Sequence, residues 1–193
     1  MTEEANSVQS KLSRNILTVA GVTAGLLLVA FLLKKTTGSP EWTATDFTVV
    51  AIMLFGTDLA YVLITHRRKE KIYPLAVALA AVTGLFFFWS NLAVGIIGSE
   101  VESANLMYFG VLIVAFLGSI ISRFKPQGLK ATMWVTAGAQ VLTVIIALMA
   151  GWQRLAESSV MEIIGLNGFF TALWVTSALL FGQVKRENKP KIP

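Results

Sequence analysis

One acidic side chain lies deep within an apolar segment of this chain. Asp58 is the only residue of formal charge well inside its stretch, which reads Leu54-Phe55-Gly56-Thr57-Asp58-Leu59-Ala60-Tyr61. An acid in such a setting is costly to bury and by default marks a functional site. No Lys, Arg or His is expected at its depth, so burial favours the neutral acid unless a cation or a proton-accepting partner intervenes. The residue types therefore suggest a proton or cation relay from Asp58 past Tyr61 towards His66.

A second polar group follows one face of a later apolar stretch. Its members are Thr132, Thr136, Gln140 and Thr143. They are spaced by four, four and three residues, so they would lie on one face of a helix. At 1.5 Å per residue, Asp58 and Gln140 are expected ~10 Å and ~13 Å from the same boundary. They would then form one inner group. That group either relays protons or holds helices together by hydrogen bonds alone.

A further polar group is predicted near the opposite boundary. Asn91 and Asn167 each lie six residues from a predicted helix end, which corresponds to ~9 Å. With Trp89 and Tyr108 they would line a small outer pocket, because carboxamides can bind a ligand without carrying charge. The alternative is tight helix packing, since glycines follow Asn91 at spacings of four and seven on the same helical face.

Six apolar stretches must position these groups. Hydrophobic residues make up 55% and charged residues 14% of the 193 positions, which leaves too few polar side chains for a water-soluble fold. Each stretch is near the ~20 residues that cross a bilayer as a helix. We therefore predict an all-α, polytopic transmembrane helical bundle, one membrane domain surrounded by lipid. The predicted spans are 15–33, 45–65, 73–97, 105–122, 131–151 and 161–182, with a short cytoplasmic tail at 183–193.

The segments between the stretches alternate between Lys/Arg-rich and Lys/Arg-poor. Three of the 16 basic residues fall on the poor side, namely Lys34, Lys35 and Arg154. The rich side carries the others, which are Lys11, Arg14, Arg67, Arg68, Lys69, Lys71, Arg123, Lys125, Lys130, Lys185, Arg186, Lys189 and Lys191. Because cytoplasmic loops are enriched in Lys and Arg, both termini are predicted to be cytoplasmic. The net charge of +5 then follows from topology and contact with anionic lipid, and no nucleic acid partner is expected.

Local signals mark helix starts and explain several acids on the Lys/Arg-poor side. Thr43 with Asp46, and Ser159 with Glu162, have the spacing of a capping box. The acids at 100 and 102 precede a predicted helix start, where negative charge is favourable. The first apolar stretch is interpreted as a retained helix, because no small-residue cleavage site follows it as in a signal peptide.

Two blocks of the sequence resemble a known family. The first is Trp89-Ser90-Asn91-Leu92-Ala93-Val94-Gly95-Ile96-Ile97-Gly98-Ser99-Glu100 with the following Ala104-Asn105-Leu106-Met107-Tyr108-Phe109-Gly110, and the second is Gly165-Leu166-Asn167-Gly168-Phe169-Phe170. Both are similar to a family of small, uncharacterised bacterial six-helix integral membrane proteins, over about the second to sixth spans. The resemblance implies a multi-pass protein of the bacterial cytoplasmic (inner) membrane. It supplies no activity, so no functional residue is carried over.

Two classes of function fit these patterns. The first is a small carrier, channel or ligand-binding membrane protein that uses either the outer Asn/Trp pocket or the inner Asp58/Gln140 group. The alternative is a non-catalytic accessory or scaffold subunit of a larger membrane complex. A Gly21/Gly25 pair with GxxxG spacing favours either a homo-oligomer or packing within the bundle.

Enzymatic and cofactor chemistry find no support in the residue types. We expect no catalytic site, because the sequence lacks a recognisable nucleophile and base pair, an HExxH motif or paired acids inside the spans. No cofactor or metal is expected either. The chain has no Cys and a single His, which removes Cys-based metal sites and a bis-histidine haem.

Overall fold

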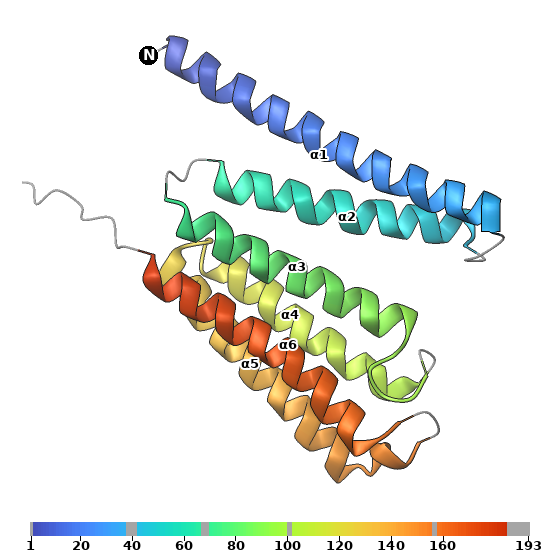
Figure 1. Cartoon of the computed structure of the whole chain (residues 1–193). Coiled ribbons are helices and arrows are strands. Elements are labelled where there is room, and N and C mark those ends of the chain that lie inside the picture. Colours follow the sequence, from blue (N-terminus) through green and yellow to red (C-terminus); the bar gives the residue numbers. More distant parts are fainter. Residues whose placement is uncertain (1, 38–41, 67–69, 100–101, 156–157, 185–193) are drawn as a thin grey trace, which may run out of the picture. The chain divides into compact units, whose positions relative to one another are not determined.

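The computed structural model describes residues 2–37, 42–66, 70–99, 102–155 and 158–184. Within these ranges all regular structure is helical (Figure 1). The α-helices are α1 (Thr2–Thr37), α2 (Ala44–Thr65), α3 (Ile72–Ala93), α4 (Leu106–Ile121), α5 (Pro126–Met149) and α6 (Val160–Gln183), and the short 3-10 helices are η1 (Ser103–Asn105) and η2 (Trp152–Arg154). Six helical segments, the fourth formed by η1 together with α4, are long and apolar enough to cross a membrane, which confirms the predicted all-α fold class at that level.

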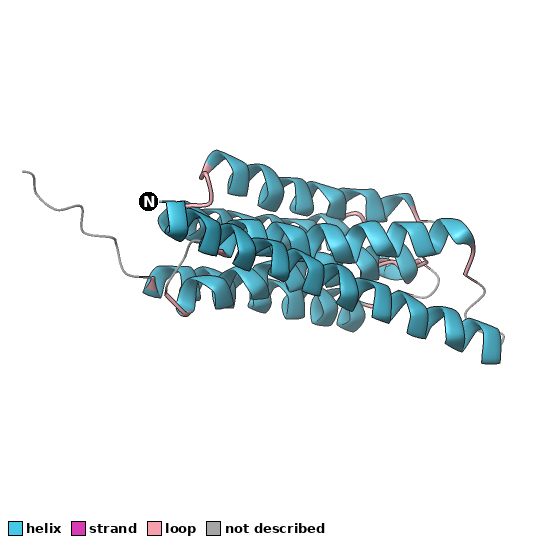
Figure 2. Ribbon diagram, turned by 90° about the horizontal axis from the view of Figure 1, so that it is seen from above, coloured by secondary structure: helices cyan, strands magenta, loops and turns pink. Residues whose placement is uncertain are grey.

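The helices form two compact units, Met1–Arg67 and Arg68–Pro193. The first is a hairpin of α1 and α2, in which the rings of Phe31 and Phe47 meet edge to face at 6.2 Å between centroids. The Lys34 ammonium donates a hydrogen bond to the Trp42 carbonyl at the same end of the hairpin. The second unit is a bundle of the remaining four helices, whose axes run roughly parallel or antiparallel (Figure 2). The prediction of one membrane domain stays a prediction.

Helix α6 connects α3 to α5 within the α3–α6 unit. It packs against both α5 and α3, and α5 also packs against α4. The Tyr73 hydroxyl, near the start of α3, donates to the Phe124 carbonyl between α4 and α5 at 2.7 Å. The basic residues Lys71, Arg123 and Lys125 flank these two points, so they lie at one end of the unit. The other basic positions after α2 and α6 that were assigned to this side, and Glu100, lie outside the described residues.

Capping chemistry fixes where α2 and α6 begin. The Asp46 carboxylate accepts from the Thr43 backbone N–H at 2.6 Å, and the Thr43 hydroxyl accepts from the Asp46 N–H at 3.3 Å, which confirms the capping box. The Ser159 hydroxyl accepts from the Glu162 N–H at 3.1 Å. Each cap satisfies a backbone donor that has no partner within the helix.

The third apolar stretch is shorter as a helix than predicted. Helix α3 ends at Ala93 rather than at position 97. Gly95 and Gly98 follow it with φ of 81° and 60°, values that glycine adopts at little cost and that let the chain turn. The expected helical face shared by Asn91 and these glycines is therefore wrong. Helix α5, in contrast, begins five residues before the predicted span, with Pro126 in its first turn.

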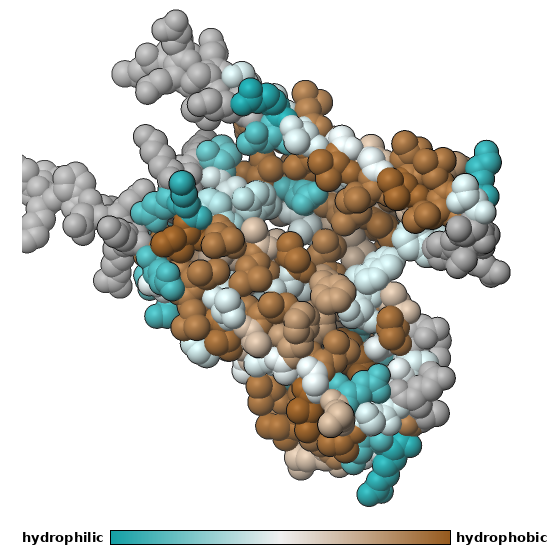
Figure 3. All heavy atoms as spheres, viewed as in Figure 1, coloured by the Kyte–Doolittle hydropathy of each residue, from teal (hydrophilic) through white to brown (hydrophobic). Residues whose placement is uncertain are grey.

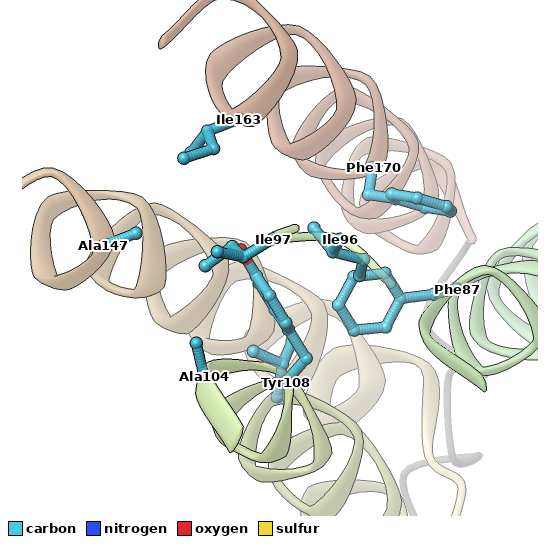
Figure 4. Packing of buried hydrophobic residues seen from close by; sticks show 9 residues of the cluster. Phe87, Ile96, Ile97, Ala104, Tyr108, Ala147, Ile163 and Phe170 are labelled. Carbon is cyan, nitrogen blue, oxygen red and sulfur yellow. The ribbon is translucent and has the colours of Figure 1, made fainter. Parts of the chain in front are cut away.

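The segment after α3 turns back into the core of its unit. Ile96 and Ile97 are 3% and 0% exposed. Figure 4 shows both side chains among residues from α3, α4, α5 and α6, with Phe87, Tyr108, Ala147, Ile163 and Phe170 around them. This loop therefore contributes to the packing that holds the four helices together, because buried side chains of this size each bring a substantial transfer free energy.

The outer surface of the α3–α6 unit is largely apolar. On the face seen in Figure 3, brown residues cover the middle of this unit and teal residues lie near the ends of its helices. Large side chains such as Phe116, Ile121 and Met149 are 66%, 81% and 84% exposed. A water-soluble protein rarely leaves so much contiguous apolar surface uncovered.

Candidate functional site

A chain of uncharged polar side chains crosses the core of the α3–α6 unit. Gln140 from α5 donates through Nε2 to Asn167 Oδ1 of α6 at 2.5 Å. Asn167 Nδ2 donates to the Tyr108 hydroxyl of α4 at 3.2 Å and to the Ile163 carbonyl at 2.7 Å. Gln140, Asn167 and Tyr108 are each 0% exposed. Three helices are thus joined by direct side-chain hydrogen bonds within the hydrophobic core.

Thr143 extends this chain along α5. Its hydroxyl donates to the Gln140 carbonyl at 2.7 Å. Thr136 and Thr132, predicted on the same face, are both buried and donate to carbonyls four residues earlier in α5. The predicted polar stripe therefore faces the interior of the unit.

A second polar cluster fixes the loop between α3 and α4. Asn105 Oδ1 accepts from the Ile96 and Ile97 N–H groups, both at 3.0 Å. Its Nδ2 donates to the Ile97 carbonyl at 3.1 Å and to the Ser99 carbonyl at 2.8 Å. Asn91 Nδ2 in turn donates to the Asn105 carbonyl at 3.2 Å. One carboxamide thus satisfies backbone groups that the inward turn of this loop would otherwise leave unpaired.

The structure groups the predicted site residues differently from the sequence. Gln140 and Asn167 were assigned to separate layers, and this is wrong because their amides are directly hydrogen-bonded. The outer group is also divided: Tyr108 and Asn167 belong to the core chain, whereas Asn91 belongs to the loop cluster. Trp89 is half-buried on α3. The depth of Gln140 was misjudged because α5 begins earlier than predicted, which places Gln140 nearer the outer end of the helix.

Asp58 lies in the other unit. It is half-buried on α2, fourteen residues from Ala44 and seven from Thr65. Among the described residues it has no hydrogen bond or ion pair. Tyr61 follows it by one helical turn and is half-buried, and the Thr65 hydroxyl donates to the Tyr61 carbonyl at 2.7 Å. Of the two acids in α2, Asp46 is used in capping, whereas the hydrogen-bonding capacity of Asp58 is left free.

The helical register places Asp58 on the side of α2 that faces α1. Asp58 follows Phe47 by eleven residues, about three turns, so the two share a helical face. Phe47 contacts Phe31 of α1. On α1, Thr23 precedes Lys34, which bonds to the start of α2, by the same eleven residues. Asp58 and Thr23 therefore lie on the facing sides of the hairpin.

Thr23 is a polar residue that the sequence reasoning missed. It is 5% exposed, and its hydroxyl has no hydrogen-bond partner, although Thr18 and Thr36 of the same helix each bond to a carbonyl four residues earlier. From the Phe31–Phe47 contact, Thr23 lies ~12 Å and Asp58 ~16.5 Å along their helices. The two side chains are thus about one turn apart in height.

The chemistry available in the hairpin is that of oxygen ligands and a titratable acid. A carboxyl group and a hydroxyl can bind a proton, a water molecule or a small hard cation. Among the described residues, no three His, Asp or Glu side chains gather in a way that could hold a metal ion. The α3–α6 unit differs in kind, because its buried polar groups are carboxamides and hydroxyls without charge.

No protein-family model, curated protein or solved structure matches this chain. The resemblance of the two sequence blocks to uncharacterised bacterial membrane proteins therefore stays a prediction.

Proposed function

We propose that this chain is a multi-pass protein of the bacterial cytoplasmic membrane with both termini in the cytoplasm. Six apolar helices and the apolar outer surface of the α3–α6 unit support the membrane setting. The orientation rests on the uneven distribution of Lys and Arg between alternate loops. Lipid is then the environment of the exposed apolar side chains.

Within that setting, the proposed function is a small carrier or channel for protons or small cations. Asp58 in the α1–α2 hairpin is the binding group. The observation that carries this proposal is the free Asp58 carboxyl, placed well inside α2 and on the side that faces the buried, unpaired hydroxyl of Thr23. A carboxyl group kept only for packing would be expected to use its hydrogen-bonding capacity within its own hairpin.

Transport by purified protein in liposomes tests this function. Asp58→Asn keeps the size and polarity of the side chain but cannot release a proton or hold a cation by charge. We expect wild-type protein to carry a proton or cation current, read with a pH-sensitive dye or an ion-selective electrode, and Asp58→Asn to abolish it. The melting temperature should stay nearly unchanged, because Asp58 makes no hydrogen bond that the substitution would break.

Asp46→Asn provides the matched control. It removes the charge of the other α2 acid, whose carboxylate caps the helix at its end, so the current should persist even if the variant is less stable. A wild-type current no greater than that of empty liposomes, or an undiminished current in Asp58→Asn, would overturn the proposed function.

A specific observation also favours the accessory or scaffold alternative. The carboxamides of Asn105 and Asn167 are used in internal hydrogen bonds, as expected of groups that specify helix packing. If Asp58 has the same role, Asp58→Leu should lower the melting temperature markedly while no current is seen in any form. An unaltered melting temperature in Asp58→Leu would count against this alternative.

A further inference from the structure

The orientation of the Asn167 carboxamide is fixed by its neighbours. The Ile163 carbonyl, 2.7 Å away, can only accept a hydrogen bond, so the nitrogen of Asn167 must face it. Asn167 Oδ1 therefore faces Gln140 and needs a donor, which must be Gln140 Nε2. Gln140 Oε1 is then left as an acceptor. It is buried and has no hydrogen-bond partner.

A buried donor without a partner lies further along the same helix pair. Trp174 is 1% exposed, and its Nε1 is the only nitrogen among the buried unpaired side-chain atoms of the described residues. It follows Asn167 by seven residues, so it shares the same face of α6 at a distance of ~10 Å along the axis. We call the buried strip between Gln140 and Trp174 the α5–α6 seam.

The directions of the side chains bring these two groups towards each other. Long side chains on a helix lean towards its N-terminus. Because α5 and α6 are consecutive antiparallel helices, Gln140 leans along the seam towards Trp174, and Trp174 leans towards Gln140. Thr136 lies between them in height, one turn before Gln140, with 0% exposure. Its hydroxyl donates to the Thr132 carbonyl at 2.9 Å and keeps its lone pairs free.

On the α3 side, the seam is closed by tight packing. A Cβ added at Gly84 would lie 3.6 Å from Trp174 Cη2, so the indole ring lies directly against the α3 backbone. The ring is therefore held in position by its surroundings. A fixed indole presents its N–H in a defined direction, which suits the binding of a small molecule better than a mobile side chain does.

We propose that the α5–α6 seam binds one small uncharged molecule with a hydroxyl group, of which water is the smallest. Its O–H donates to Gln140 Oε1, and its oxygen accepts from Trp174 Nε1. Buried polar groups without partners are rare in folded proteins, and an internal molecule with two or three polar contacts is the usual solution. The seam carries no charged side chain from Ala131 to Met149 or from Ile163 to Gln183, which disfavours an ionic ligand.

The indole N–H of Trp174 reports directly on this site. In the ¹⁵N-labelled full-length protein in micelles, the five Trp residues give five indole signals, and Trp174→Phe identifies the one of interest. We expect that proton at the low-field shift of a hydrogen-bonded indole, with a cross-peak to the bound molecule. A cross-peak to water identifies water, and one to a carbon-bound proton identifies an organic hydroxyl compound.

Two variants and a control connect the signal to the seam. Gln140→Met removes the acceptor at nearly constant shape. Thr136→Val removes the hydroxyl that lies between Gln140 and Trp174 in height, and it leaves the bond between Gln140 and Asn167 in place. Both should weaken the cross-peak and move the Trp174 signal upfield. Gln127→Met, at an exposed position in the first turn of α5, should change neither. An indole proton at the shift of an unbonded group in wild-type protein, or a cross-peak unaffected by both variants, would overturn the proposal.

Discussion

At the scale of single residues, Asn105 has the densest set of hydrogen bonds in the described chain. Its side chain accepts from two backbone N–H groups and donates to two carbonyls, all within the loop from 96 to 99. The loop enters a core of apolar side chains, where water cannot take over these bonds. Asn105 therefore determines whether Ile96 and Ile97 can be buried at all.

Asn105→Ala should destabilise the protein strongly. The substitution leaves the N–H groups of Ile96 and Ile97 buried without an acceptor, which we expect to cost roughly 2–4 kcal/mol in the free energy of unfolding. Unfolding in detergent micelles, followed by Trp fluorescence, measures the difference. Ser103→Ala is the matched control, because Ser103 is exposed in the same η1 turn. Equal stability of the two variants would contradict the role given to Asn105.

At the scale of elements, Gly118 is one of the glycines that allow the close approach of α4 and α5. A Cβ at Gly118 would lie 2.6 Å from Cγ2 and 2.9 Å from Oγ1 of Thr132. Thr132 cannot rotate away freely, because its hydroxyl donates to the Gly128 carbonyl at 3.0 Å and β-branched side chains in helices have few rotamers. The two helices would have to separate to admit a methyl group.

Gly118→Ala is therefore expected to destabilise the α3–α6 unit by about 1–3 kcal/mol. Gly110→Ala on the same helix is the control, since nothing lies within 4 Å of its added Cβ. That variant should be neutral or more stable by up to about 1 kcal/mol, because alanine favours the helix. Adding Thr132→Ala should restore part of the loss in Gly118→Ala. Equal melting temperatures for the two glycine variants would rule out this close contact.

The helices themselves were predictable, but their side-chain pairing was not. Apolar length alone identified six helices, and the spacing of Thr43 and Asp46 gave the start of α2. Hydropathy did not show that α3 ends at Ala93, because the loop that follows is as apolar as a helix and is buried in the core. The bond between Gln140 and Asn167 depends on the relative height of two helices. Errors of a few residues in their ends changed that height.

At the scale of the whole molecule, polar chemistry differs between the two units. The α3–α6 unit uses uncharged amides and hydroxyls in a connected chain of hydrogen bonds. The α1–α2 hairpin instead holds a free carboxyl and an unpaired buried hydroxyl. The buried unpaired groups of the α3–α6 unit are all uncharged, so the capacity to bind and release ions lies with the carboxyl group of the hairpin, as the proposed function requires.

The orientation of the molecule can be tested with single cysteines, because the chain contains none of its own. Ser103→Cys in η1 lies on the Lys/Arg-poor side and Gln127→Cys in α5 on the basic side, and both positions are exposed. In intact cells, a membrane-impermeant maleimide should label Ser103→Cys, and it should label Gln127→Cys only after permeabilisation. The reverse pattern would place the termini outside.

Ile113→Cys completes this test by separating exposure to lipid from exposure to water. Ile113 is 54% exposed near the middle of α4, so in water its thiol would react as readily as one at position 103. In a bilayer the same thiol lies in hydrocarbon, where it remains protonated and the aqueous reagent cannot reach it. We expect no labelling before or after permeabilisation and full labelling once the protein is denatured. Labelling of the folded protein at this position would contradict the membrane setting itself.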